Sequence, residues 1–463
     1  MVPDKHQGKA MICFRYLGVI VQSKYGITLV ALAVLLPGTA RAQFNIEKKL
    51  KGNDTQKSDN FGYAVGLDDD TAIVGAHWNG TSRGERTRGA AYIFQRDRGG
   101  TDNWGQFMIL KALDKETHDA FGHSVAISGD IAIAGAIGDD DACPSDDFCR
   151  SGSAYIFDGT SAFDQVAKLT ASDATQGDYF GWSTAVSGDT AIVGATRDGG
   201  GSAYIFQQNN GGTNNWGEVA KLIASDVAIG DRFGTSLSIS GDTAIVGAFR
   251  NDDVGSNSGS AYIFERNNGG ANNWGQVAKL TASDATSQDD FGMAVSLSGN
   301  IAIVGARGND DNGTRSGSAY IFERNNGGTS NWGEVAILTA SDAAEWDEFG
   351  HTVSISGERA IVGAIGNDDG GTHAGAAYIF TQNQGGANNW GELKKLTFSN
   401  GNIHQRFGES VSISGETALV GQSTTKLALL YTSSGSSLVP EPSTLVLMVL
   451  GGLGLVTYRR RQC

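Results

Sequence analysis

Residues 233–248 read FGTSLSISGDTAIVGA, and this stretch decides the fold predicted for the whole chain. After Phe233-Gly234, serine alternates with leucine and isoleucine, which is the two-residue period of a β-strand with one apolar face. The Ser-Gly-Asp that follows is typical of a tight hairpin turn. The run TAIVGA at 243–248 is continuously apolar, as expected of a strand buried on both faces. The stretch therefore predicts two adjacent antiparallel strands.

The same pattern recurs at intervals of 53 to 60 residues, so the chain is built from an internal repeat. Downstream of the quoted stretch, GSAYIF at 259–264 is aromatic and β-branched and predicts a third strand. A Gly/Asn-rich turn then leads to VAKLT at 277–281, a more polar segment that suits an outer edge strand. Each repeat is thus predicted to hold four strands. The pairs that mark the seven repeats are Phe61-Gly62, Phe121-Gly122, Phe180-Gly181, Phe233-Gly234, Phe291-Gly292, Phe349-Gly350 and Phe407-Gly408.

Sheets of this size cannot bury both faces alone and must stack on their neighbours. Closing seven of them into a ring removes long exposed edges, and seven falls within the four to eight blades typical of β-propellers. An open β-solenoid is the structural alternative, but its repeats are normally shorter. We therefore expect an all-β fold over residues 43–432, a seven-bladed β-propeller of four-stranded blades.

The two ends of the repeat array predict how the ring closes. The segment IEKKL at 46–50 precedes the first Phe-Gly pair but matches the outer strand ELKKL at 392–396. The seventh repeat reaches its third strand, LALLY at 427–431, and lacks a fourth. We expect the N-terminal strand to complete the last blade, so deletion of residues 44–54 should destabilise the whole ring.

Residues 1–42 have the features of a secretory signal peptide. Scattered basic residues precede an apolar run from Gly26 to Leu36, which is too short to span a bilayer comfortably. Ala40-Arg41-Ala42 is a small-x-small cleavage signal, so export with cleavage before Gln43 is expected. An uncleaved N-terminal anchor is the alternative.

A second targeting segment follows the repeats. A Ser/Gly linker with Pro440, Glu441 and Pro442 occupies 433–443, and an apolar stretch with an arginine tail occupies 444–463. These features resemble the PEP-CTERM sorting tail of exported proteins from Gram-negative bacteria. The resemblance implies an exosortase-like processing enzyme, removal of the tail, and delivery to the cell surface or extracellular matrix. The residues expected to stay cytoplasmic are Arg459, Arg460 and Arg461.

Contact of this tail with the inner membrane is expected to be transient. The apolar stretch is short for a permanent span of the bilayer, although a plain C-terminal membrane anchor is the alternative.

The body of the chain is strongly acidic. The net charge is −15, and because residues 1–42 carry +4 and the three terminal arginines +3, the segment between them carries about −22. Such a body repels phosphate backbones and anionic lipids, which argues against nucleic acid as a partner.

Two cysteines, Cys143 and Cys149, lie outside the terminal segments. An even pair six positions apart in one loop of an exported protein predicts a local disulfide. A metal site is the weaker alternative, because no second pair of cysteines or histidines stands beside them.

The combination of Phe-Gly with a later Gly-Ala, as in Phe233-Gly234 and Gly247-Ala248, resembles the FG-GAP repeat of integrin α-subunit propellers and many bacterial surface proteins. The resemblance covers residues 45–432. It implies that Phe-Gly packs at the start of each blade and that the small pair lets adjacent blades meet. Calcium sites of that family lie between the first and second strands, where this chain has a turn too short to surround calcium with six to eight oxygens.

The longer loops between strands two and three, and the connections between blades, are rich in aspartate and should make one face strongly negative. One interpretation is a ring of weak calcium sites or a cation-attracting surface, because calcium prefers hard oxygen ligands. The other, which we favour, is solvated aspartate that serves turns, caps and solubility, since no complete calcium-loop motif is present. The calcium candidates are Asp252, Asp253, Asp310, Asp311, Asp368 and Asp369.

Recurring tryptophans just before the outer strands offer either a surface for sugar rings or an anchor for the hairpin, and the anchor is favoured for a repeat-locked aromatic residue. Catalytic motifs are absent, and the histidines are interpreted as scattered without a shared repeat position. The tryptophans are Trp104, Trp216, Trp274, Trp332 and Trp390. The histidines are His77, His118, His123, His351, His373 and His404.

The leading hypothesis is therefore a non-enzymatic, adhesion-type protein of the cell surface or matrix. It would bind a surface polysaccharide or a protein ligand through a propeller face. One alternative is an extracellular polysaccharide hydrolase that uses carboxylates on a propeller face. The other is a purely structural matrix component.

Overall fold

The structure, a computed structural model, describes residues 19–23, 26–30, 43–56, 59–80, 88–101, 103–142, 149–212, 215–328, 331–384, 386, 388–398 and 404–434. The chain divides into two compact units, one of residues 1–41 with 436–463 and the other of residues 42–435. In the first unit, β1 (Val19–Ser23) pairs antiparallel with β2 (Gly26–Val30). The rest of the predicted signal peptide and the sorting tail lie outside the described residues. Within the described part of the chain, no helix has the length and apolar character needed to cross a membrane.

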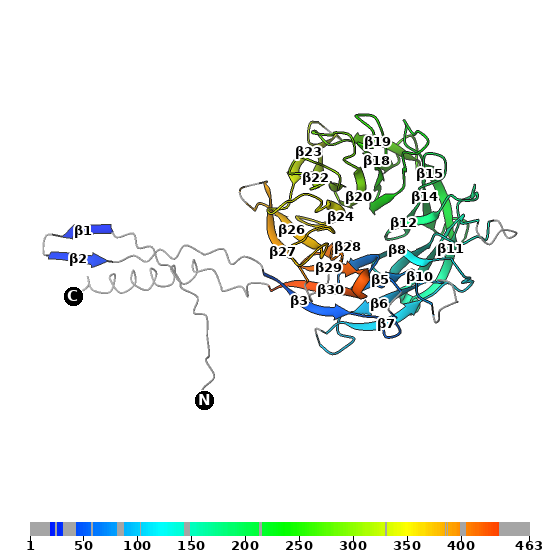
Figure 1. The fold of residues 1–463 in the computed structure, drawn as a ribbon, viewed down its shortest axis with the longest axis horizontal. Helices are drawn as coiled ribbons and strands as arrows, with labels where there is room; N and C mark the ends of the chain where they lie inside the picture. The colour runs from blue at the N-terminus through cyan, green and yellow to red at the C-terminus, as the bar shows by residue number, and fades with distance from the viewer. Residues whose placement is uncertain are drawn as a thin grey trace, which may run out of the picture. The chain divides into compact units, whose positions relative to one another are not determined.

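Residues 42–435 form seven four-stranded antiparallel sheets, so the predicted seven-bladed propeller is confirmed. Figure 1 shows the sheets arranged as blades of a ring, with the first strand of a blade near the centre and the fourth at the rim. We number the blades along the chain and call the first strand of each blade its inner strand and the fourth its outer strand.

The strands of the first three blades follow one another in sequence. Blade 1 consists of β4 (Val65–Asp68), β5 (Thr71–Ala76), β6 (Ala90–Gln95) and β7 (Gly105–Leu110). Blade 2 consists of β8 (Phe121–Ser128), β9 (Ile131–Ala136), β10 (Ser153–Asp158) and β11 (Asp164–Leu169), with the 3-10 helix η1 (Gly159–Ser161) before its last strand. Blade 3 consists of β12 (Phe180–Ser187), β13 (Thr190–Ala195), β14 (Ser202–Gln208) and β15 (Trp216–Leu222).

The next three blades repeat this order. Blade 4 consists of β16 (Ser236–Ser240), β17 (Thr243–Ala248), β18 (Ser260–Arg266) and β19 (Trp274–Leu280). Blade 5 consists of β20 (Phe291–Ser298), β21 (Ile301–Ala306), β22 (Ser318–Arg324) and β23 (Trp332–Leu338). Blade 6 consists of β24 (Phe349–Ser356), β25 (Arg359–Ala364), β26 (Ala376–Gln382) and β27 (Trp390–Leu396).

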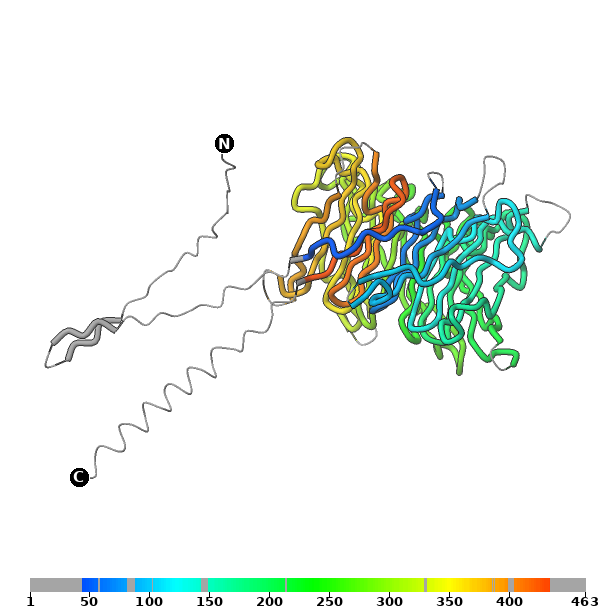
Figure 2. The backbone as a smooth tube through the Cα atoms, turned by 90° about the horizontal axis from the view of Figure 1, so that it is seen from below, coloured from blue at the N-terminus to red at the C-terminus, as the bar shows by residue number. Residues whose placement is uncertain are grey.

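Blade 7 closes the ring with strands from both ends of the propeller. It consists of β28 (Ser410–Ser414), β29 (Thr417–Gln422), the 3-10 helix η2 (Ser423–Thr425), β30 (Leu427–Ser434) and the N-terminal strand β3 (Gln43–Leu50). The pairing of β3 with β30 is antiparallel and extends from Gln43 opposite Ser434 to Leu50 opposite Ala428. In Figure 2 the blue N-terminal strand runs beside the orange strands of the C-terminal part. The predicted completion of the last blade is thus confirmed.

The Phe-Gly and Gly-Ala pairs meet where neighbouring blades pack. Phe233 is fully buried and its ring packs edge-to-face on Phe264 of its own blade, 5.9 Å between centroids. Gly234 has a φ of +83°, a conformation that a side chain disfavours. A Cβ atom on Gly247 would come within 2.0 Å of the Gly292 backbone oxygen in the next blade. Only a glycine at this position leaves room for the neighbouring backbone.

Serine hydroxyls join the inner strands of adjacent blades. The Ser238 hydroxyl oxygen accepts a hydrogen bond from the Leu297 N–H at 3.1 Å, and equivalent bonds recur around the ring. Between blade 7 and blade 1, Ser412 accepts from the Leu67 N–H at 3.1 Å. The serine face of the alternating inner strands therefore binds the next blade.

Antiparallel strand order gives the propeller two different faces. The loops between the second and third strands and the connections between blades lie on one face, which we call the loop face. The hairpin turns between the first and second strands and between the third and fourth strands lie on the other, the turn face. A bridge between Gly259 and Phe291 joins a loop of blade 4 to the start of blade 5 on the loop face. The acidic loops singled out from the sequence all belong to the loop face.

Candidate functional site

A pocket of about 430 Å³ opens on the loop face at the centre of the ring. Residues at the start of all seven inner strands form its wall, beginning with the residue that directly follows each Phe-Gly pair. We call these seven residues the pocket ring. In blade order they are Tyr63, His123, Trp182, Thr235, Met293, His351 and Glu409.

Aromatic rings cover the side of the pocket formed by blades 1 to 3. The ring centroid of Tyr63 lies 4.3 Å from that of His77 and 5.3 Å from that of His123. His123 continues the row to Trp182 at 4.9 Å, and its Nδ1 lies 3.2 Å from the Trp182 backbone oxygen. A mainly apolar, aromatic wall of this kind suits stacking against a flat or ring-shaped ligand.

Charged groups lie at the side of the pocket formed by blades 5 to 7. Arg406 pairs with Glu409 at 3.7 Å, and Arg307 pairs with Asp290 at 3.1 Å. Nδ1 of His351 is buried and has no hydrogen-bond partner among the described residues. Blades 5 to 7 therefore contribute polar and charged groups to the pocket, whereas blades 1 to 3 contribute the aromatic wall.

The histidines at the pocket are neutral at physiological pH. Burial lowers the pKa of His123 to about 4, and it lowers the pKa of His77 to about 3. Burial, together with the charges of Arg307 and Arg406, lowers the pKa of His351 to about 3. A neutral imidazole has one donor and one acceptor nitrogen, so His123 and His351, which line the pocket, add polarity to it without adding charge.

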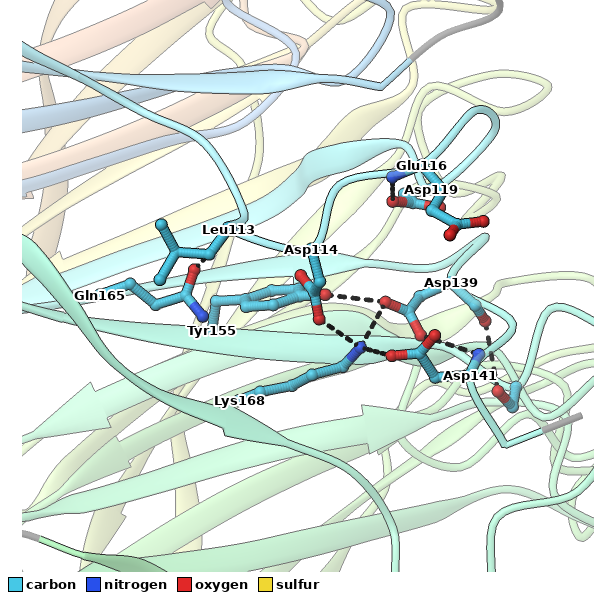
Figure 3. A network of polar contacts seen from close by, with 10 residues as sticks. Leu113, Asp114, Glu116, Asp119, Asp139, Asp141, Tyr155, Gln165 and Lys168 are labelled. Carbon is cyan, nitrogen blue, oxygen red and sulfur yellow. Dashed lines mark hydrogen bonds and ion pairs between the residues drawn. The ribbon is translucent and has the colours of Figure 1, made fainter. Parts of the chain in front are cut away.

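A second polar cluster recurs nearer the rim of the loop face in blades 2, 3, 4 and 6. In blade 2, Lys168 Nζ lies 2.8 Å from Asp114 and 2.9 Å from Asp139, and it also pairs with Asp141 (Figure 3). Ligand oxygens of these three aspartates lie within 4.8 Å of one another, as they would in a metal site. The ammonium among them supplies the positive charge that a metal ion would bring, so the group fits an ion-pair network better than a divalent cation. The equivalent lysines are Lys221, Lys279 and Lys395.

Five of the six predicted calcium ligands have partners of their own. Three of these aspartates each accept a hydrogen bond from the backbone N–H five residues later, at 2.6 to 2.7 Å. Each bond lies within the loop that carries the aspartate and stabilises it. The three aspartates are Asp252, Asp310 and Asp368. Asp253 and Asp369 instead pair with the lysines of their outer strands. These contacts fit aspartates that serve turns and ion pairs, and calcium binding by them stays a prediction.

Blade 5 lacks the lysine. Ile337 lies opposite Tyr320, at the place that lysine takes in blades 2, 3, 4 and 6. The sixth calcium candidate, Asp311, interacts with Asp284 here, and burial together with the Asp284 carboxyl group raises the pKa of Asp311. The Tyr320 hydroxyl donates to Asp284 at 2.8 Å. Blade 5 thus holds the acidic pair of the repeat without its lysine.

The recurring tryptophans lie at or directly before the start of the outer strands. Trp104, Trp216 and Trp332 are buried, and Trp274 and Trp390 are half-buried. Each packs against the apolar core between blades. Their packing agrees with the hairpin-anchor interpretation rather than with a surface for sugars.

Other predicted site residues fall wholly or partly outside the described residues. Cys149 is buried and disulfide-bonded, but Cys143 lies outside them, so the Cys143–Cys149 pairing stays a prediction. The sorting residues Pro440, Glu441 and Pro442 also lie outside them, as do the tail residues Arg459, Arg460 and Arg461.

Large apolar side chains are also exposed on the loop face. Trp78, Leu113, Ile229, Val254 and Trp346 lie there with exposed fractions of 51% to 94%. Among the described residues of the turn face, no large apolar side chain of a turn is exposed. The loop face therefore exposes large apolar side chains that the described turns of the turn face do not.

The pocket ring was missed from the sequence, and one expectation was wrong. His123 and His351 both directly follow a Phe-Gly pair and line the same pocket, so the histidines do share a repeat position. The sequence feature that could have revealed the pocket ring is the variation of the residue after each Phe-Gly pair. When the seven repeats are set side by side, this position changes among six residue types while the Phe-Gly before it stays the same.

Comparison with known families agrees with this architecture. The family model described as FG-GAP repeat matches residues 44–94, 104–157, 163–206, 216–264, 274–322, 332–380 and 390–437. The model described as PEP-CTERM protein-sorting motif matches residues 438–461, the range that contains the predicted Pro-Glu-Pro and arginine signals. No curated protein sequence matches the chain.

Proposed function

Because the chain belongs to the FG-GAP repeat family and carries a PEP-CTERM sorting motif, we propose that it is a non-enzymatic binding protein that contacts its ligand through the loop face. The sorting motif implies processing by an exosortase and export to the cell surface in Gram-negative bacteria. The ligand class proposed is a surface polysaccharide or a protein of the same compartment.

The pocket ring is the observation that carries this proposal. Neighbouring repeats are nearly alike in their cores, where the Phe-Gly pairs are buried in every blade. The pocket ring differs from blade to blade, with Trp182 in one blade and Thr235 in the next. Ring closure alone does not require such variation. An uneven pocket at the centre of a regular ring can hold one ligand in a defined orientation.

The exposed apolar side chains favour the loop face over the turn face. Apolar groups that stand out on a rim of polar residues are typical of contact surfaces. Ile229 and Leu113 are exposed by 94% and 82%, and both belong to connections between blades. A ligand that enters the central pocket would lie on the same face as these side chains.

A glycan array tests the proposal with the purified protein and three substitutions. Trp182→Ala and His123→Ala shorten the aromatic wall and are expected to weaken binding at least tenfold. Phe107→Ala is the matched control, because it removes an aromatic ring from the outer strand β7. Equal binding by all three variants and the wild type would remove the pocket from the proposal.

An activity screen on the same glycans separates binding from turnover. The proposal expects bound glycan and no products. Hydrolysis that disappears in a Glu409→Gln variant would favour the extracellular hydrolase instead. A folded protein that binds no glycan and no surface protein would favour the purely structural role.

We propose calcium binding only for the aspartate cluster of blade 5. In the other four clusters a lysine already provides the positive charge, whereas Asp284 and Asp311 have none between them. Carboxylate, amide and phenol oxygens are hard ligands that suit calcium. A calorimetric titration of the wild type and of Ile337→Lys tests this: heat is expected in the wild type and not in the variant. A wild type without heat would remove calcium from the proposed function.

A further inference from the structure

Four arginines on the loop face of blades 2 to 4 have no carboxylate partner in the described part of the chain. Arg150 precedes the third strand of blade 2, and Arg197 and Arg250 follow the second strands of blades 3 and 4. Arg232 directly precedes Phe233 at the start of blade 4. We call these four residues the arginine patch.

The charges of the patch lie close to one another. Burial and the nearby Arg197 and Arg250 lower the pKa of Arg232. Like charges held together without a counterion repel each other. A bound anion would relieve this repulsion.

Aromatic rings hold the guanidinium groups in place. Arg197 lies 4.5 Å above the centre of the Tyr179 ring, and Arg250 lies 5.3 Å from that of Phe249. Arg150 Nη1 donates to the Tyr179 hydroxyl at 3.0 Å. Stacking uses the flat face of a guanidinium and leaves its N–H edge for a bidentate acceptor such as a carboxylate or a sulfate.

The two arginines in the loop between the second and third strands of blade 5 are paired. Arg307 lies 3.1 Å from Asp290, and Arg315 lies 3.0 Å from Glu348. The chain has 50 acidic against 35 basic side chains, so partners are abundant. An unpaired basic patch on blades 2 to 4 is therefore an exception within an acidic protein, and it calls for an external anion.

We propose that the arginine patch binds the acid groups of an anionic polysaccharide at the rim of the central pocket. This proposal rests on the proposed function, because it names the ligand class of the same face. The patch continues into the aromatic wall, since the Tyr179 ring lies 6.2 Å from the Trp182 ring. Sugar rings can stack on these aromatic side chains while their carboxylates or sulfates meet the arginines.

The surroundings favour a polysaccharide over a nucleic acid. Outside the patch the acidic protein repels a duplex that carries one charge every ~1.7 Å along its axis. A polysaccharide offers uncharged ring faces to Tyr179 and Trp182 between its acid groups. Its export route also brings the protein to the cell surface, where it can meet such a polymer.

Binding to polygalacturonate and hyaluronan, measured by calorimetry with the full chain, tests the proposal. Fully methyl-esterified polygalacturonate is the neutral matched ligand. We expect the wild type to bind both acidic polymers, with an affinity that falls as salt rises, and to bind the ester at least tenfold more weakly. Failure of the wild type to bind either acidic polymer at low salt would overturn the proposal.

Substitutions assign the binding to the patch. The double variant Arg197→Gln/Arg250→Gln changes two exposed side chains and is expected to lose at least tenfold in affinity. Arg98→Gln is the matched control, because Arg98 is also exposed and stacks on an aromatic ring, but on the turn face. It should bind as the wild type does, and thermal unfolding of all variants checks that they remain folded.

The outcomes distinguish this proposal from the proposed function. If the double variant keeps full affinity while Trp182→Ala loses it, the pocket binds glycan and the arginine patch does not. Tighter binding of polyglutamate or single-stranded DNA than of either polysaccharide would overturn the ligand class. Binding of neutral glycans alone would leave the proposed function standing and overturn the anionic ligand.

Discussion

At the scale of the residue, single hydroxyl groups form hydrogen bonds that join adjacent blades. The Ser236 hydroxyl donates to the Gly292 backbone oxygen of the next blade at 2.8 Å, and the serine or threonine in blades 2, 3, 6 and 7 makes the same bond. Blades 1 and 5 carry Ala64 and Ala294 at this position. The junctions that follow those two blades therefore lack this hydrogen bond.

Restoring the hydroxyl in blade 5 is expected to stabilise the propeller. Ala294→Ser should raise the free energy of unfolding by about 1 kcal/mol, because it supplies a donor to the adjacent Gly350 oxygen. Ser236→Ala should lower it by about the same amount. Urea denaturation measures both values. A destabilised Ala294→Ser variant would show that blade 5 has no room for the oxygen.

Acid is expected to destabilise the folded protein through the pocket histidines. His351 has a pKa of about 3 in the folded protein against 6.5 as its ordinary value. Between these values the unfolded chain binds a proton that the folded protein does not, so stability is complete above pH ~6.5 and falls as the pH drops toward ~3. In urea denaturation at pH 7, 5.5 and 4.5, the free energy of unfolding of the wild type minus that of His351→Gln should decrease as the pH falls.

The pH dependence of the wild type has to be compared with that of the variant, because the carboxyl group of Asp119 changes the free energy of unfolding with pH in the opposite direction. Burial raises the pKa of Asp119 to about 6, so its contribution is complete below pH ~3.8 and is lost as the pH rises through 6. That contribution is common to both proteins and cancels in the comparison. Identical pH dependence of the two proteins would show that His351 is not neutral by burial.

At the scale of the element, the outer strand determines in blades 2 to 6 whether the acidic loops are neutralised. Strands β15, β19 and β27 each supply a lysine to two aspartates and β11 supplies one to three, whereas β23 supplies Ile337. The aspartates come from a loop of the same blade and from the connection before it. One residue in an outer strand thus controls the charge of two loops.

Removing the lysine from blade 4 and introducing one in blade 5 should change the free energy of unfolding in opposite directions. Lys279→Met removes the cation between Asp226 and Asp253 and is expected to lower the free energy of unfolding by up to ~1 kcal/mol, a small value because the pair is partly exposed. Ile337→Lys should raise it by a similar amount in blade 5. Thermal unfolding at low and high salt measures both, and the differences should shrink at high salt. A stabilised Lys279→Met variant would contradict the ion-pair interpretation.

Much of the fold could be predicted from the sequence, because its determinants are local and repeated. The alternation after Phe233 and the apolar run before Gly247 predict strands directly, and the IEKKL segment at 46–50 predicts the completion of blade 7. The role of the serine face could not be predicted in the same way. Whether Ser238 meets solvent or the next blade depends on how the sheets pack, and the sequence pattern is the same in both cases.

The site was harder to predict because its parts come from distant segments. Arg150, Arg197 and Arg250 are about 50 residues apart and meet only because the ring places equivalent loops side by side. Lys168 and Asp114 are likewise separated by 54 positions. Counting acidic residues predicted a negative face, but their pairing with lysines and the unpaired arginines depend on three-dimensional neighbours.

At the scale of the whole molecule, β3 makes the ring a closed structure. Phe44 and Leu50 on this strand are buried, and Tyr92 of blade 1 donates to Asp54 at 2.7 Å just beyond it. Deletion of residues 44–54 removes these contacts and leaves the edge of β30 unpaired.

The deletion is expected to lower the free energy of unfolding by roughly 5 kcal/mol or more, since each large apolar side chain contributes ~1.5–3 kcal/mol when buried. Thermal unfolding followed by circular dichroism measures the effect. Truncation after Gly435 is the control, because it leaves all strands of the propeller in place. An unchanged melting temperature after the deletion would show that β3 is dispensable for closure.

The pairing of Gln43 with Ser434 also fixes where the chain joins the propeller at its two ends. Strand β30 ends, and β3 begins, on the turn face, so the chain enters and leaves the propeller at neighbouring points of that face. The pocket and the arginine patch lie on the loop face, at the other ends of the strands. Neither of the two points where the chain joins the propeller therefore narrows the way by which a ligand reaches them.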